Sequence, residues 1–115
     1  MFEAQLLNYN SKVFSPWMAR GGDNLVFSAE VIDKNLTSAF TIQLFEKNTE
    51  TTGSGDPVAG GPTLDFTTAV SKTSSPAEGL KELVRYEFSF TATGASGDWV
   101  LFRMLAPVWY NAVKA

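Results

Sequence analysis

The fold is decided by residues 84–92, which read Val84-Arg85-Tyr86-Glu87-Phe88-Ser89-Phe90-Thr91-Ala92. Apolar or aromatic residues occupy every even position of this stretch, and charged or hydroxyl-bearing residues occupy every odd position. Successive side chains of a β-strand point to opposite faces of its sheet. The pattern therefore predicts a strand with one face toward a core and the other toward solvent.

The same period-two alternation recurs along most of the chain. It predicts further strands at 25–32, 40–47, 64–70 and 99–104, an opening strand at 2–9, and a short strand at 12–15 that Pro16 ends. Turns rich in Gly, Asn and Asp are expected at 20–24, 33–35 and 94–98. No helical period is sustained over about 11 residues, and at most 76–83 forms one helical turn. We therefore predict an all-β fold, a single antiparallel β-sandwich of about seven strands with Ig-like or jelly-roll-like Greek-key connections.

The length and charge of the chain restrict its partners. Its 115 residues suit one domain spanning 1–115. The 9 Lys and Arg against 12 Asp and Glu give a net charge of −3, and the basic residues are scattered, so a surface for nucleic-acid phosphates is not expected. The sequence has no apolar run of about 18 residues, which argues against a membrane span. Because 1–8 lacks the features of a signal peptide, we expect synthesis in the cytoplasm.

Residues 80–92 resemble the tyrosine-corner segment of fibronectin type III and related immunoglobulin-like β-sandwiches. In that family a Leu precedes the corner Tyr by six residues and alternating apolar residues follow, the last of them small, as do Leu80, Tyr86, Phe88, Phe90 and Ala92. The Pro of the family pattern is replaced by Glu82, and no Trp occupies a clear third-strand position. The resemblance implies that the Tyr86 hydroxyl ties down the chain where it crosses between the sheets. It implies no function, because the fold hosts many functions.

Three segments do not follow the strand pattern. The stretch 49–62 contains four Gly and two Pro, and it is expected to be a long loop, as is 71–79. These loops are either solvated connections between sheets or arms that order on a neighbouring subunit or a ligand. The tail 107–115 is apolar for a chain end, so we expect it to dock on its own sheet or on that of a neighbour.

Catalytic groups are scarce in this sequence. It contains no Cys and no His, which excludes a disulfide, a Cys/His zinc site, and a His that activates Ser or Thr. Two carboxylate pairs, Glu82 with Glu87 and Asp23 with Asp98, have the residue type for acid–base work, but solvated surface carboxylates are the usual case. We therefore expect no enzyme activity, no catalytic residue and no cofactor.

Calcium is the metal that the sequence accommodates best. Asp33 with Asn35, or Asp56, offers oxygen ligands in predicted loops, but the spacing of an EF-hand is missing. Turn chemistry explains the same residues without a metal. We accordingly predict no metal site.

The large aromatic residues are the best candidates for an interaction surface. Trp17 follows Ser15-Pro16, whereas Trp109 and Tyr110 follow Pro107. These rings either cover the ends of the core or form an exposed binding face. In addition, apolar residues occupy the strand faces expected to point outward, namely Val26, Ile32, Phe45, Val100 and Phe102. The predicted interface comprises Trp17, Phe45, Phe102, Trp109 and Tyr110.

Three functional hypotheses follow from these features. The first is a non-enzymatic structural subunit that self-associates or decorates a larger assembly, most concretely a phage or virion coat, cement or fibre-associated protein. Its partners would be copies of itself or a larger protein assembly, with neither nucleic acid nor membrane. The second is a carbohydrate-binding module in which Trp17, Trp109 and Tyr110 stack on sugar rings. The third is a calcium-binding accessory domain of an enzyme.

Overall fold

The computed structural model describes residues 5–8, 12–35, 39–50, 52–53, 55–58, 63–66, 71–90 and 97–111. Within these ranges the protein consists of strands and irregular connections, without a helix. The strands are β1 (Gln5–Asn8), β2 (Lys12–Phe14), β3 (Met18–Ala19), β4 (Asn24–Val26), β5 (Ser28–Asn35), β6 (Phe40–Lys47), β7 (Asp56–Pro57), β8 (Thr63–Phe66), β9 (Ser71–Thr73), β10 (Leu83–Phe90), β11 (Trp99–Met104) and β12 (Val108–Tyr110). None of the described segments is a helix long and apolar enough to span a membrane.

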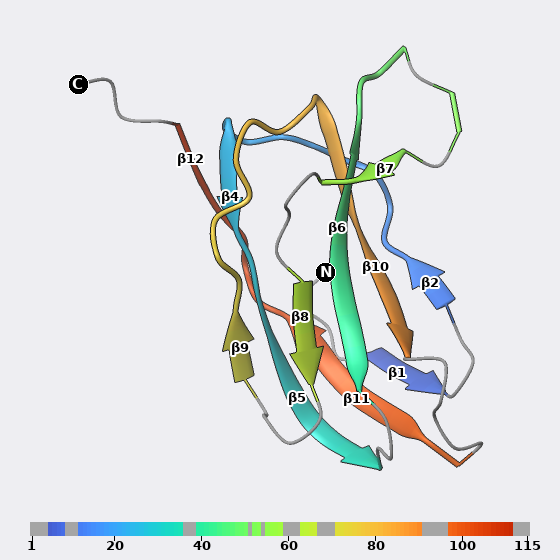
Figure 1. Cartoon of the computed structure of the whole chain (residues 1–115). Coiled ribbons are helices and arrows are strands. Elements are labelled where there is room, and N and C mark those ends of the chain that lie inside the picture. The colour runs from blue at the N-terminus through green and yellow to red at the C-terminus, as the bar shows by residue number, and fades with distance from the viewer. Residues whose placement is uncertain are drawn as a thin grey trace.

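The strands form two main antiparallel sheets that pack on each other. One sheet has the order β1-β11-β5-β9, and the other has the order β2-β10-β6-β7, with β3 pairing with β10 and β8 pairing with β6. β12 and β4 form a separate two-stranded ribbon. Figure 1 shows β5 and β11 running together in one layer, β6 and β10 in the other, and β12 leading away to the C-terminal end. The predicted antiparallel β-sandwich is confirmed.

The strand order is that of a jelly roll. Setting aside the short strands β3, β4, β7 and β12 leaves eight strands in chain order. The first of these pairs with the last (β1 with β11), the second with the seventh (β2 with β10), the third with the sixth (β5 with β9) and the fourth with the fifth (β6 with β8). This nested pairing is a long hairpin of strands rolled into two sheets. An immunoglobulin-like order would put the last two long strands in one sheet, whereas β10 and β11 lie in different sheets.

The core lies between the inner faces of the two sheets, where the predicted alternation places it. The inward residues of β5, β6 and β10 are buried, apart from the partly buried Phe90, and so are Leu64 and Phe66 of β8. The ring centroids of Phe40 and Phe102 are 4.7 Å apart, and those of Phe88 and Phe102 are 5.0 Å apart, so these rings join the two layers. The buried apolar residues are Leu7, Leu25, Phe27, Ala29, Val31, Phe40, Ile42, Leu44, Val58, Leu64, Phe66, Ala77, Leu80, Val84, Tyr86, Phe88, Val100, Phe102 and Met104.

The expected placement of Val100 and Phe102 on an outward face is corrected by the structure. Val100 is fully buried and Phe102 is 1% exposed, so both point into the core. β11 is apolar on both faces, and period-two alternation then gives no signal for which face is inward. The pairing with β5 also shifts register between Leu101 and Phe102, where β5 has a bulge at Ile32.

Strands occur inside both stretches that were expected to be loops. Ser71–Thr73 form β9 within 71–79, and Asp56–Pro57 form β7 within 49–62. Further along 71–79, Ala77 forms a bridge with Leu25 of β4. In the tail, β12 pairs with β4, so this segment docks on its own chain. Some predicted residues lie outside the described ones: 2–4, 9, 67–70, 91–96 and 112–115 of the strands, turn and tail, and 51, 54 and 59–62 of the loop.

The described residues do not form the hydrogen bond that the tyrosine-corner resemblance implies for Tyr86. The Tyr86 side chain is fully buried, and its hydroxyl has no hydrogen-bond partner among the described residues. Burial raises the pKa of Tyr86 from 10.0 to about 12, because the charged phenolate is poorly solvated there. Its ring instead packs in the core against Phe27 at a centroid distance of 5.3 Å.

Candidate interaction surfaces

A cluster of aromatic and basic side chains covers part of the outer face of the six-stranded sheet. It comprises Phe14, Trp17, Phe45, Lys47 and Arg85, and we call it the aromatic–basic cluster. The guanidinium carbon of Arg85 lies 3.8 Å from the ring centroid of Phe14 and 4.5 Å from that of Trp17. The Lys47 Nζ lies 4.8 Å from the Trp17 centroid, and the Phe14 and Phe45 rings meet edge to face at 5.7 Å. Both cations therefore contact aromatic faces, a favourable electrostatic arrangement.

Strand register brings these residues together. Arg85 of β10 is directly opposite Phe45 of β6 in the antiparallel ladder. Ser15 ties the chain between β2 and β3 to β10, because its N–H donates to the Tyr86 carbonyl at 2.9 Å and its Oγ accepts from the Tyr86 N–H at 2.9 Å. This reciprocal pair holds Phe14 and Trp17 beside Arg85.

Gly55 completes the packing around Trp17. Its φ of +74° lies in the left-handed region that L-residues with a Cβ rarely adopt. A Cβ at this position would lie 2.7 Å from the Trp17 ring and 2.7 Å from the Glu46 carbonyl oxygen. The backbone at Gly55 thus lies directly against the indole, and Trp17 is half-buried.

The other predicted aromatic residues lie on the β4–β12 ribbon. Trp109 packs against the core, and a Cβ added to Gly21 would lie 2.7 Å from its ring. Tyr110 is 37% exposed and Val108 is 60% exposed. The Asp23 N–H donates to the Asn111 Oδ1 at 3.0 Å. This bond fixes the C-terminal end of β12 to the turn that precedes β4.

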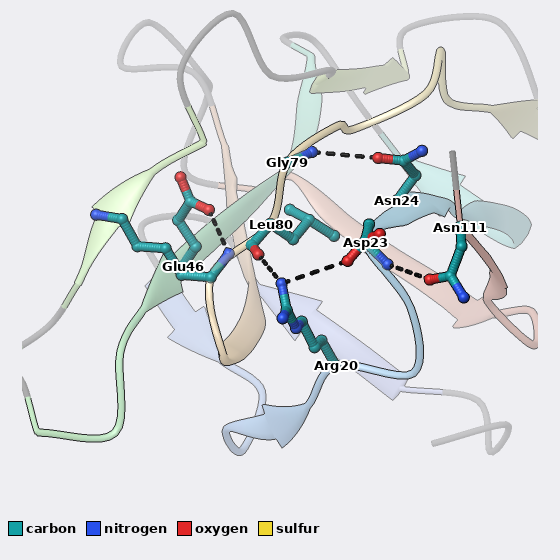
Figure 2. A network of polar contacts seen from close by, with 8 residues as sticks. Arg20, Asp23, Asn24, Glu46, Gly79, Leu80 and Asn111 are labelled. Carbon is teal, nitrogen blue, oxygen red and sulfur yellow. Dashed lines mark hydrogen bonds and ion pairs between the residues drawn. The ribbon is translucent and has the colours of Figure 1, made fainter. Parts of the chain in front are cut away.

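A polar network holds the segment before β10 against β4 and β6 (Figure 2). The Arg20 Nη1 donates to the Leu80 carbonyl at 2.5 Å and lies 3.8 Å from the Asp23 carboxylate. The Gly79 N–H donates to the Asn24 side chain at 3.2 Å. The Lys81 N–H donates to the buried Glu46 carboxylate at 3.0 Å. These bonds pair backbone groups of an irregular segment that has no ladder partners, and the network is structural.

Apolar side chains also point outward from the four-stranded sheet. Leu6 of β1 is 61% exposed and lies opposite Leu101 of β11. Ile32, at the bulge of β5, is 49% exposed. Single exposed apolar residues are ordinary. Here, Leu6 and Ile32 come from the strands on either side of β11 in one small sheet.

A pocket of about 320 Å³ opens at the edge between the sheets. Val13, Ser15 and Pro16 line its mouth, and Tyr86 and Met104 line its inner wall. The inner residues are at most 2% exposed, and the Tyr86 hydroxyl is covered. The pocket is therefore lined mainly by apolar side chains.

The carboxylates considered for acid–base work have separate partners. Glu82 accepts hydrogen bonds from the Thr49 N–H and hydroxyl, at 3.0 and 3.1 Å, whereas Glu87 lies 3.6 Å from Lys12 Nζ. Asp98 is buried, whereas Asp23 faces Arg20.

The calcium ligands considered above also have protein partners. The Asp33 carboxylate accepts from the Lys34 N–H, and the Asn35 amide donates to the Gly97 carbonyl. In the part of the chain that the structure describes, no group of three or more metal-ligating side chains is found.

The predicted interface residues divide into three groups. Trp17 and Phe45 belong to the aromatic–basic cluster, Trp109 and Tyr110 belong to the ribbon, and Phe102 is in the core. The sequence analysis missed Phe14, Lys47 and Arg85. The available signal was the position of Arg85 and Lys47 on the outward faces of predicted strands.

A scan against models of protein families, a search of curated proteins and a search of solved structures each found no match.

Proposed function

We propose that this chain is a non-enzymatic structural subunit that self-associates or decorates a larger assembly. Its most concrete form is a coat, cement or fibre-associated protein of a virus particle. The observation that supports this best is the outward exposure of Leu6, Ile32 and Val108 in a domain with a well-filled core. Apolar side chains that are half exposed or more gain free energy when a partner covers them.

The fold gives a second, weaker line of support. Jelly rolls are common among viral capsid domains and also among lectin domains. The same fold serves many unrelated functions, so this support is an analogy. The exposed apolar positions favour protein association over the lectin analogy.

The sugar-binding alternative requires a common aromatic platform. Trp17 packs on Gly55 with Lys47 and Arg85 over its ring, whereas Trp109 packs on Gly21. No ring contact joins these two described indoles. Saturable quenching of Trp fluorescence by glycans would nevertheless favour that alternative over the assembly proposal.

Light scattering and sedimentation test the proposal. We expect the mass of the purified chain to rise above 12.5 kDa with concentration, and electron micrographs to show regular particles, tubes or lattices. The triple variant Leu6→Lys, Ile32→Lys, Val108→Lys is expected to remain monomeric, because charge at these positions opposes burial. A wild-type chain that stays monomeric at the highest concentration, with an unchanged triple variant, would contradict self-association.

A further inference from the structure

We infer that two copies of this chain join along the free edge of β12, through antiparallel pairing of β12 with β12 of the second copy around a two-fold axis at Trp109. The inference rests on the self-association proposed above and identifies both the strand and the partner. It depends on which backbone groups of β12 are already bonded.

The hydrogen bonds of β4 show which way the backbone of β12 faces. The Leu25 N–H donates to the Ala77 carbonyl, and the Ala77 N–H donates to the Leu25 carbonyl, both at 2.9 Å. In a strand the N–H and C=O of one residue point to the same side, and those of its neighbours point to the other side. The backbone groups of Leu25 therefore point away from β12, and those of Asn24 and Val26 point toward it.

Because β12 pairs with β4, the same alternation applies to the residues of β12 that lie opposite. Trp109 is opposite Leu25, Val108 is opposite Val26, and Tyr110 is opposite Asn24. Val108 and Tyr110 therefore direct their backbone groups to β4, and the N–H and C=O of Trp109 point to the open side. No described strand pairs with β12 on that side.

β12 lacks the protection that four other edge strands carry. Charged residues or proline on an edge strand discourage pairing with another chain. Edge strands of this protein carry such charges: Lys12 in β2, Asp56 in β7, Asp65 in β8 and Lys72 in β9. β12 has none over Val108–Tyr110. β1 and the two-residue β3 also have none, and β1 serves below as the matched control.

A second copy fits this edge because the two-fold arrangement is self-complementary. With the axis at Trp109, each Trp109 N–H meets the Trp109 C=O of the other copy. Val108 is then opposite Tyr110 of the second copy, and the reverse pair forms as well. Both side chains are exposed in the single chain and share one face of β12, because they are two residues apart. Cross-strand pairs of an aliphatic with an aromatic residue are favourable.

The strand is held in an extended shape before any partner arrives. Trp109 packs on Gly21, and Asn111 accepts the Asp23 N–H, so the middle of β12 and the residue after it are tied to the turn before β4. Such preorganisation lowers the entropy lost on pairing. Pro107, which has no N–H, limits how far the intermolecular ladder extends toward β11. We therefore expect a weak, concentration-dependent pair.

Hydrogen exchange of single amides, followed by NMR, tests the geometry. The amides of Val108 and Tyr110 are expected to be protected at every concentration, because they bond to β4. The Trp109 amide is expected to exchange at least about tenfold more slowly, equivalent to ~1.4 kcal/mol, when the chain is concentrated from about 20 µM to about 1 mM. An unchanged Trp109 exchange rate in a protein whose mass shows association would overturn the inference and leave the proposed function standing.

Two matched variants test the strand. Val108→Lys places a charge on β12, and Asn8→Lys places one on an exposed side chain of β1. We expect Val108→Lys to weaken association at least about tenfold and Asn8→Lys to weaken it by less than about threefold. The reverse order would assign association to β1 and overturn the inference. A wild-type chain that is monomeric throughout would overturn both the inference and the proposed function.

Discussion

The guanidinium of Arg85 lies 3.8 Å from the ring centroid of Phe14, and the two residues come from neighbouring strands of the six-stranded sheet. The same guanidinium also contacts Trp17, so one cation lies against two aromatic rings on the outer face of the six-stranded sheet. All three side chains are only half exposed or less. Because partial desolvation strengthens such contacts, the aromatic–basic cluster is expected to stabilise the edge where β2 joins β10.

Replacing Arg85 tests that contribution. Arg85→Met keeps an apolar stem but removes the cation, and it is expected to lower the free energy of unfolding by about 1 kcal/mol. The control is Arg103→Met, which removes an exposed ion pair with Glu30 at 3.1 Å and is expected to cost less than about 0.5 kcal/mol. Urea unfolding measures both. Equal losses would show that the aromatic contacts add nothing.

Gly55→Ala tests the close approach of the backbone to Trp17. The new methyl group meets the indole and the Glu46 carbonyl, and the left-handed φ is strained as well, so we expect a loss of about 2 kcal/mol and a shift in Trp emission. Gly53→Ala is the matched control, since Gly53 has a φ of +98° and nothing within 4 Å of its added Cβ. A Gly53 variant as unstable as the Gly55 variant would attribute the whole effect to backbone strain.

The Tyr86 hydroxyl is expected to contribute no stability at neutral pH. The Tyr86 hydroxyl is buried without a hydrogen-bond partner among the residues that the structure describes. Removing such a hydroxyl relieves a desolvation cost, so Tyr86→Phe should be neutral or stabilising by up to about 1 kcal/mol. A tyrosine-corner hydrogen bond would give the opposite sign. Chemical denaturation at pH 7 distinguishes the two, and a loss above about 1 kcal/mol would show that the hydroxyl has a partner.

Alkaline pH provides an independent test of the same residue. The folded pKa of Tyr86 is raised from 10.0 to about 12, so the unfolded chain loses this proton first as the pH rises. The free energy of unfolding is independent of this proton below pH 10 and falls between pH 10 and about 12, by up to about 3 kcal/mol. Tyr86→Phe should remove this fall in the free energy of unfolding with pH, whereas Tyr110→Phe should keep it. Parallel pH profiles for wild type and Tyr86→Phe would contradict the burial argument.

The sequence contained enough information to predict the sandwich and most of its inner faces. β6 and β10 alternate between apolar and polar or basic residues over most of their length, so period two is sufficient to place Ile42 and Tyr86 in the core. β11 is apolar on both faces, and Phe102 could not be assigned to a face without its neighbours. β9 reads Ser-Lys-Thr and carries no apolar signal, because it is a short edge strand that buries little.

The interaction surfaces depend on strand order and register, which are not local properties of the sequence. Phe14 and Arg85 are 71 positions apart and meet only because β2 pairs with β10. The direction of the Trp109 backbone groups is inferred from the two hydrogen bonds between Leu25 and Ala77, and Ala77 belongs to the expected 71–79 loop. The individual aromatic residues could be singled out from the sequence, but their division between two separate surfaces could not.

The central claim is that the outward apolar side chains are covered when copies meet. Covalent surface labelling of the full chain at about 5 µM and about 500 µM, read out by mass spectrometry, tests it most directly across a hundredfold range of concentration. We expect labelling of at least one of Leu6, Ile32 and Val108 to fall at least about twofold at the higher concentration, while the exposed Arg103 is labelled as before. Unchanged labelling of all three positions, in a chain whose mass stays at 12.5 kDa, would contradict the account.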